Sequence, residues 1–221
     1  QLLPTDIKIS LIKSMIDYGC NEIELGVFSK IPKLTRQYQD MEALASAILP
    51  YAEERGVKIT SLVNDYEDAR RSLDLGISNV SCFLSVSEEF AKGFDTTAEK
   101  SFADLAAIAK LPDVNVTLAL GAVFGSPFGD ETPVSRSIAY ARRGIELGAS
   151  VIGLADSAGM AAPDQIRSTL CVFLDSFSPS QLSIHLHDTE GFGMANAYAA
   201  LECGITDFDT SLGAMGGCPV I

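Results

Sequence analysis

The sequence has few basic residues for its length, and this shortage already limits the kinds of partner it can bind. Lysine and arginine number 16 against 29 aspartates and glutamates, so the formal net charge is −13 at pH 7. Nucleic acids and anionic membrane surfaces are bound through clustered positive charge, which releases their counterions. We therefore expect a small-molecule substrate, and neither a nucleic acid nor a membrane as partner.

Other absences exclude further classes of protein. No apolar run approaches the roughly 18 to 20 residues that a membrane-spanning helix needs. The first ten residues, QLLPTDIKIS, lack the basic and apolar segments of a signal peptide. The five cysteines are odd in number and form no CxxC pair, which is typical of a reducing compartment. We expect a cytoplasmic protein.

Amphipathic stretches alternate seven times with short β-rich runs, and this alternation predicts the fold. The expected strands are 22–29, 57–63, 79–87, 115–125, 150–159, 182–191 and 205–217. The helical stretches before them are 7–16, 41–55, 65–75, 97–110, 133–147, 163–177 and 193–203. A glycine follows five of these stretches, as a left-handed C-cap requires: Gly19, Gly56, Gly76, Gly148 and Gly204.

Strands that alternate with helices of this length predict βα units and a parallel sheet, hence an α/β protein. A doubly wound nucleotide-binding sheet would carry GxGxxG after an early strand, and the sequence has no such fingerprint. The pattern therefore favours a (β/α)8 TIM barrel that forms a single catalytic domain over residues 1–221. Because the sequence opens directly on a helix and stops after the seventh strand, we expect the first strand and the C-terminal end of the barrel to be missing.

Both histidines of the chain lie one residue apart, on the expected strand 182–191. Residues i and i+2 of a strand point to the same side, so His185 and His187 should present two imidazoles together. Neutral imidazoles at this spacing can bind one metal ion, with Asp188 as a residue that orients a ligand. Two core histidines bonded to polar neighbours would have the same spacing, so spacing alone leaves both interpretations open.

Three further candidates lie where expected strands end, the place where barrels put their catalytic residues. Glu24 could reach the mouth of the barrel, although the pattern alone favours a carboxylate paired with an interior lysine or arginine. Asp156 could be catalytic or could simply start the turn that follows its strand. Cys218 lies in the glycine-rich 213-GAMGGCP-219, and its thiol, with an ordinary pKa of about 8.5, could donate a proton or be an ordinary loop cysteine.

Four segments taken together resemble the hydroxymethylglutaryl-CoA lyase family. In chain order they are IELGVFS, GLADSAG, IHLHDTEGFGMAN and GAMGGCP. The resemblance runs from residue 1 to residue 221. The combination of HxHDTxGxxxAN with GGCP is specific, because relatives that make isopropylmalate or citramalate more often carry HxHND and lack the cysteine loop.

The resemblance implies a metal-dependent TIM-barrel lyase that cleaves 3-hydroxy-3-methylglutaryl-CoA to acetyl-CoA and acetoacetate by retro-Claisen chemistry. It implies that His185 and His187 bind Mg²⁺ or Mn²⁺. It also implies that Glu24 and Asp156 act at the catalytic centre and that Cys218 is the proton donor. Because dimers are common in the family, we expect a homodimer.

Two alternatives stay open: an acetyl-CoA-dependent 2-oxo acid synthase of the isopropylmalate or citramalate type, and a non-catalytic barrel. The sequence departs from the family in lacking its first-strand Arg-Asp pair and the asparagine ligand beyond the cysteine loop. Ser126 stands where many relatives have cysteine. CoA would need a local basic spot, for which Lys30, Lys33 and Arg36 are candidates, although such residues more often form a solvated loop.

Overall fold

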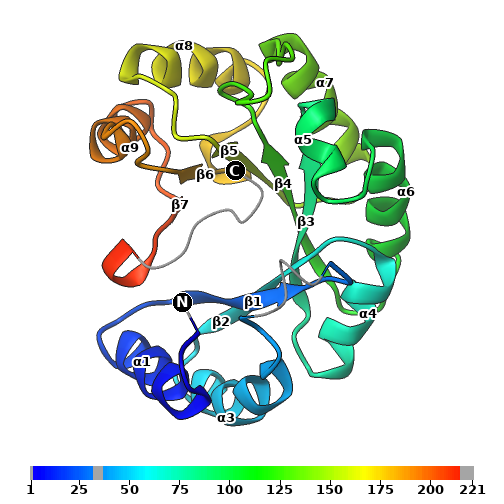
Figure 1. Cartoon of the computed structure of the whole chain (residues 1–221), viewed down its shortest axis with the longest axis vertical. Helices are drawn as coiled ribbons and strands as arrows, with labels where there is room; N and C mark the ends of the chain where they lie inside the picture. The colour runs from blue at the N-terminus through cyan, green and yellow to red at the C-terminus, as the bar shows by residue number, and fades with distance from the viewer. Residues whose placement is uncertain (1, 32–36, 215–221) are drawn as a thin grey trace. The chain divides into compact units, whose positions relative to one another are not determined.

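The computed structural model describes residues 2–31 and 37–214, and it has the alternation of strands and helices that the sequence predicts (Figure 1). The strands are β1 (Glu22–Phe28), β2 (Lys58–Val63), β3 (Asn79–Ser85), β4 (Asn115–Gly121), β5 (Val151–Asp156), β6 (Leu182–Leu186) and β7 (Phe208–Asp209). Each described pairing between them is parallel. In this part of the chain, no helix is long and apolar enough to cross a membrane.

The α-helices lie close to the predicted ranges, with one addition. They are α1 (Thr5–Asp17), α3 (Met41–Glu54), α4 (Tyr66–Asp74), α5 (Glu88–Lys92), α6 (Ala98–Ile108), α7 (Val134–Glu146), α8 (Pro163–Leu174) and α9 (Gly193–Glu202). The five predicted C-cap glycines all have positive φ, between +67° and +111°. Helix α5 was not predicted, because five residues are too few to show a helical period. Ser87 caps it by accepting a hydrogen bond from the Phe90 N–H.

The chain divides into two compact units. The first comprises Gln1–Cys82 with Ala107–Val116, so it holds β1, β2 and the beginning of β3. Figure 1 shows α1 and α3 side by side next to β1 and β2. Its core is formed by apolar residues of β1, β2 and α3. The buried residues are Ile23, Leu25, Leu44, Ile48, Ile59 and Val63.

The second unit comprises Phe83–Ala106 with Thr117–Ile221, and its strands β4 to β7 follow one another in chain order. Its core includes the alternate apolar residues of β4 and β5, such as Leu118 and Ile152, both fully buried, and α7 packs against β5. Gly144 lets α7 approach the sheet, since a Cβ there would collide with the Leu118 side chain. Parallel strands end at one edge of their sheet, so the polar residues that follow β5, β6 and β7 gather there.

Candidate metal centre

The two histidines lie together at the end of β6, His185 on the strand and His187 just after it, as their spacing predicts. The Nε2 atoms of His185 and His187 lie 3.2 Å apart, and the ring centroids are 5.1 Å apart. His185 exposes 46% of its side chain, and His187 is half-buried. Burial and, to a lesser extent, the neighbouring His185 lower the pKa of His187, which favours its neutral form. The two rings thus face each other through the same atom, Nε2.

The distance between these nitrogens fits a single divalent ion. Imidazole nitrogens bind such ions at about 2.0–2.2 Å, so two adjacent ligands roughly 90–100° apart would have nitrogens about 3 Å from each other. Within residues 2–31 and 37–214, no group of three or more histidine, cysteine, aspartate or glutamate side chains converges as a metal site would require. Among the described residues, His185 and His187 thus fit part of a coordination sphere.

Asp209, at the end of β7, contacts the other ring nitrogen of His185. The parallel register pairs the two residues across β6 and β7, and Nδ1 lies 2.9 Å from Oδ2. The described contact of Asp188 is a different one, and its orienting role stays a prediction. Its Oδ1 accepts a hydrogen bond from the Gly193 N–H at 2.7 Å, at the start of α9. Sequence analysis missed Asp209 because only strand pairing brings it to the histidine.

Asp156 ends β5 as predicted, and its carboxylate is almost fully buried at 1% exposure. Oδ1 accepts the Met160 N–H and Oδ2 accepts the Ala161 N–H, each at 3.1 Å. Burial raises the pKa of Asp156 above its ordinary value, against the opposing effect of these backbone hydrogen bonds and of nearby His185. The geometry supports the turn-forming interpretation of this residue, and its catalytic role stays a prediction.

The segment that follows β5 packs closely against the segment that follows β6. Gly159, with φ of +63°, packs so closely that a Cβ would lie 2.6 Å from Thr189 Oγ1 and 2.8 Å from the Thr189 backbone nitrogen. Asn196 is buried on α9 and donates from Nδ2 to the Ala161 carbonyl at 2.8 Å. Thr189 and Asn196, both in the segment IHLHDTEGFGMAN, therefore pack the turn after Asp156 against the residues that follow the histidines. The sequence did not reveal this role.

The other two predicted catalytic residues are Glu24 and Cys218. Glu24 is exposed on β1 in the first unit. Burial raises the pKa of Tyr38 in the same unit, and the charge of Glu24 adds to that shift, so the two side chains are neighbours. Cys218 lies outside the described residues. The roles of Glu24 and Cys218 both stay predictions.

Of the three basic residues suggested as a CoA-binding site, the structure describes only Lys30. Its Nζ pairs with Asp65 Oδ2 at 2.9 Å, at the N-terminus of α4, and most of the lysine side chain is exposed. Lys33 and Arg36 lie outside the described residues. Because Asp65 already neutralises Lys30, the described part of this spot offers little free positive charge to a phosphate.

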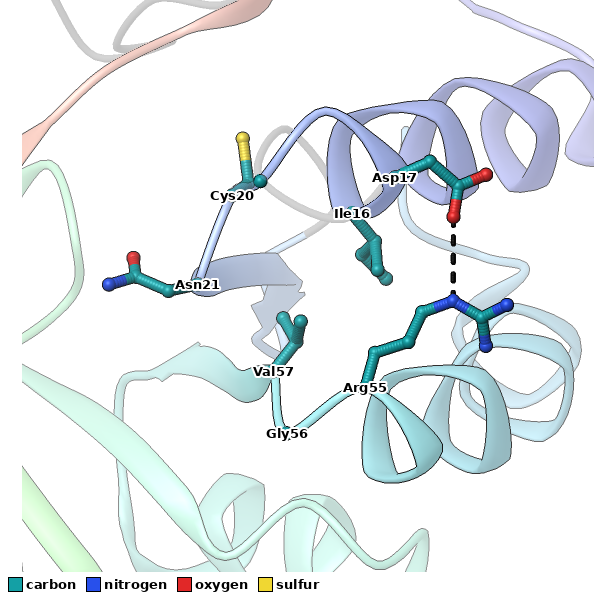
Figure 2. Close-up of a pocket in the computed structure, with 8 residues that line it drawn as sticks. Ile16, Asp17, Cys20, Asn21, Arg55, Gly56 and Val57 are labelled. Carbon is teal, nitrogen blue, oxygen red and sulfur yellow. Dashed lines mark ion pairs between the residues drawn. The ribbon is translucent and has the colours of Figure 1, made fainter.

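A hollow of about 340 Å³ lies in the first unit, at the N-terminal ends of β1 and β2 (Figure 2). Figure 2 shows Asp17, from the end of α1, meeting Arg55 just after α3, and Oδ1 lies 3.4 Å from Nε. The lining residues are Ile16, Asp17, Gly19, Cys20, Asn21, Arg55, Gly56 and Val57. Among these described residues there is no histidine and no predicted site residue, so the hollow does not mark the expected chemistry.

Comparisons with known proteins agree with the motifs. The family model described as HMGL-like matches residues 1–218. Hydroxymethylglutaryl-CoA lyase YngG of Bacillus subtilis is 31% identical over 221 residues, which cover 98% of this chain and 73% of that protein. The (R)-citramalyl-CoA lyase of Chloroflexus aurantiacus is also 31% identical, over 96% of this chain and 70% of that protein.

A solved structure extends the agreement to the fold. An HMG-CoA lyase from Acinetobacter baumannii, in complex with coenzyme A and 3-methylmalate, superposes with a TM-score of 0.93 at 30% identity. The match covers all of this chain and 72% of the other, and it confirms the expected α/β class of the TIM-barrel type. The chain belongs to the HMGL-like family, and its relatives identify it as an enzyme of the lyase class that acts on carbon–carbon bonds.

Proposed function

We propose that this chain is a divalent-metal-dependent lyase that cleaves 3-hydroxy-3-methylglutaryl-CoA, or a close 3-hydroxyacyl-CoA, to acetyl-CoA and a ketone product. The observation that carries the proposal is the convergence of His185 and His187, whose Nε2 atoms are 3.2 Å apart. The names of the relatives support an acyl-CoA substrate. The complex of the Acinetobacter enzyme with coenzyme A supports it further.

The reaction is a retro-Claisen cleavage, and it needs one proton removed and one proton added. A base takes the proton of the tertiary hydroxyl, the carbon–carbon bond breaks, and the carbinol carbon becomes the ketone of acetoacetate. The bonding electrons leave with the thioester half as an enolate, which takes up a proton on carbon to give acetyl-CoA. A divalent ion bound at the site would lower the pKa of the substrate hydroxyl.

Different residues of the chain would bind the ion, position the site and transfer the protons. His185 and His187 would hold the ion through Nε2, and Asp156 keeps the neighbouring turn in place through two backbone hydrogen bonds. We assign the proton donor role to Cys218, since a thiol with an ordinary pKa of about 8.5 is mostly protonated near neutral pH. Glu24 is the candidate carboxylate for the remaining acid–base work.

The equal identity to the (R)-citramalyl-CoA lyase favours a second candidate substrate. Citramalyl-CoA has the same tertiary hydroxyl and methyl group, but its free carboxylate is attached directly to the carbinol carbon. Cleavage would then yield a 2-oxo acid in place of acetoacetate. One methylene is worth roughly 10–200-fold in kcat/KM, so the two substrates can be separated kinetically.

The test incubates the purified protein with Mg²⁺ or Mn²⁺ and each thioester, and measures acetyl-CoA and the ketone product by mass spectrometry. We expect acetyl-CoA from at least one thioester, and its loss when EDTA is added. No acetyl-CoA from either thioester with either ion would contradict the proposal. Release of free CoA from acetyl-CoA and a 2-oxo acid would instead indicate the synthase alternative. Sedimentation velocity tests the expected homodimer.

A further inference from the structure

We propose that Asp209 is a positioning residue of the metal centre, because its carboxylate fixes the proton of His185 on Nδ1 and so keeps the Nε2 lone pair available to the ion. The inference rests on the proposed function, since it requires His185 to be a metal ligand. Asp209 lies outside the four motif segments and comes from a different strand, β7.

The contact is defined by the sheet and by the chemistry of both groups. The register of β6 and β7 pairs His185 with Asp209, and Nδ1 lies 2.9 Å from Oδ2, within normal hydrogen-bonding distance. An ionised carboxylate can only accept hydrogen bonds, so Nδ1 must carry a proton. In a neutral imidazole the other nitrogen then has no proton, and this is the nitrogen that faces His187.

The acid next to the histidines in sequence makes a different contact. Asp188 is the neighbouring acid in sequence, but its Oδ1 is occupied by the Gly193 N–H. Without an acceptor at Nδ1, the proton of His185 can reside on either nitrogen, and an imidazole protonated on Nε2 cannot bind an ion there. A carboxylate partner also makes the ligating nitrogen a better donor to the metal.

The contact is suited to positioning rather than to folding. Asp209 exposes 61% of its side chain and His185 exposes 46%, and exposed pairs contribute little to stability. A competing arrangement uses the same distances: a doubly protonated His185 that donates from Nδ1 to Asp209 and from Nε2 to His187. That arrangement would have to release the Nε2 proton before an ion could bind, so the Mn²⁺ affinity and the ¹⁵N spectra distinguish the two.

The experiment measures Mn²⁺ affinity, by following free Mn²⁺ with electron paramagnetic resonance, for the unsubstituted protein, Asp209→Ala, Asp209→Asn and Glu202→Gln. We expect Asp209→Ala to raise the Kd about 10–100-fold. Asp209→Asn should have a smaller effect, because its amide oxygen still accepts the Nδ1–H. Glu202→Gln is the matched control: Glu202 on α9 forms an exposed pair with Arg167 on α8, so its substitution removes one charge and should leave the Kd unchanged.

A second readout reports the proton itself. In ¹⁵N spectra of the imidazoles, recorded without metal near pH 8, the unsubstituted protein should show His185 protonated on Nδ1, and Asp209→Ala should shift the population toward Nε2. An equal Mn²⁺ affinity in Asp209→Ala and the unsubstituted protein would overturn the inference and leave the proposed function standing. No saturable Mn²⁺ binding by the unsubstituted protein would overturn both. Circular dichroism confirms that each variant is folded.

Discussion

Two regions of the molecule each pair a carboxylate with a nitrogen base, and only one of them contains an imidazole, the kind of base that serves as a metal ligand. In the hollow of the first unit Asp17 pairs with Arg55, whereas at the strand ends of the second unit Asp209 pairs with His185. A guanidinium stays protonated and only donates, so the first pair is complete in itself. An imidazole has a second nitrogen, which here turns toward His187. The chemistry of the base identifies the site better than the size of a hollow does.

The largest expected effect follows from removing one imidazole. His187→Ala should weaken Mn²⁺ binding at least about 100-fold and lower kcat/KM at least about 10³-fold, since a bound ion is worth several kcal/mol in the transition state. Isothermal titration and the cleavage assay measure the two values. Asp17→Asn, in the hollow, should leave both unchanged. Equal losses in the two variants would remove the distinction between the regions.

The turn at the end of β5 should respond next. Asp156→Ala leaves the Met160 and Ala161 N–H groups without their acceptor, so the free energy of unfolding should fall by about 2–4 kcal/mol. Asp156→Asn should cost less, because its amide oxygen can still accept one of these hydrogen bonds. Urea denaturation measures both. An alanine variant as stable as the unsubstituted protein would show that the carboxylate does not hold the turn.

A third carboxylate sharpens the contrast because it is buried while its basic partner is exposed. Asp68 on α4 is fully buried, and its ion-pair partner Arg71 is mostly exposed, with Nη1 3.6 Å from Oδ1. Burial and the nearby charge of Asp65 raise its pKa. A raised folded-state pKa stabilises the fold fully below the ordinary value of 3.8, and that contribution is lost as pH rises through the folded-state pKa.

Asp68→Asn removes this titration and therefore tests it. Relative to the unsubstituted protein, the asparagine variant should gain stability as the pH is raised from about 4 to 7, the interval that begins near the ordinary pKa of aspartate. Urea denaturation at several pH values gives the difference in the free energy of unfolding. A difference that does not change with pH would show that Asp68 titrates normally.

The smallest effect is expected in the hollow. Asp17 exposes 55% of its side chain. It accepts a hydrogen bond from the Tyr51 hydroxyl and also contacts Arg55. Asp17→Asn keeps an acceptor oxygen, so the free energy of unfolding should change by less than about 1 kcal/mol. A larger loss, measured by thermal or urea unfolding, would show that this pair is an important element of the first unit.

Local periodicity predicted much of the fold and the central pair of the site. Helix and strand spacing is a property of neighbouring residues, so the seven strands, the five glycine caps and the convergence of His185 with His187 could all be read from the sequence. The Asp156 turn was also anticipated as one of two interpretations.

The contacts that sequence analysis missed depend on pairing between distant segments. Asp209 is 24 residues from His185, and only the register of β6 with β7 brings them together. Adjacency in sequence favoured Asp188, but a strand ends there and the chain turns, so its carboxylate meets α9 instead. Asn196 lies in a recognised motif, yet its hydrogen bond to Ala161 needs two packed loops to be visible.

The most direct test of the central claim is pulsed electron paramagnetic resonance of the Mn²⁺-loaded protein. Two histidines that bind one ion should produce nitrogen couplings from two imidazoles, and either His185→Ala or His187→Ala should remove one of them. Bound Mn²⁺ with no imidazole coupling would contradict the account, because the ion would then lie away from the paired Nε2 atoms.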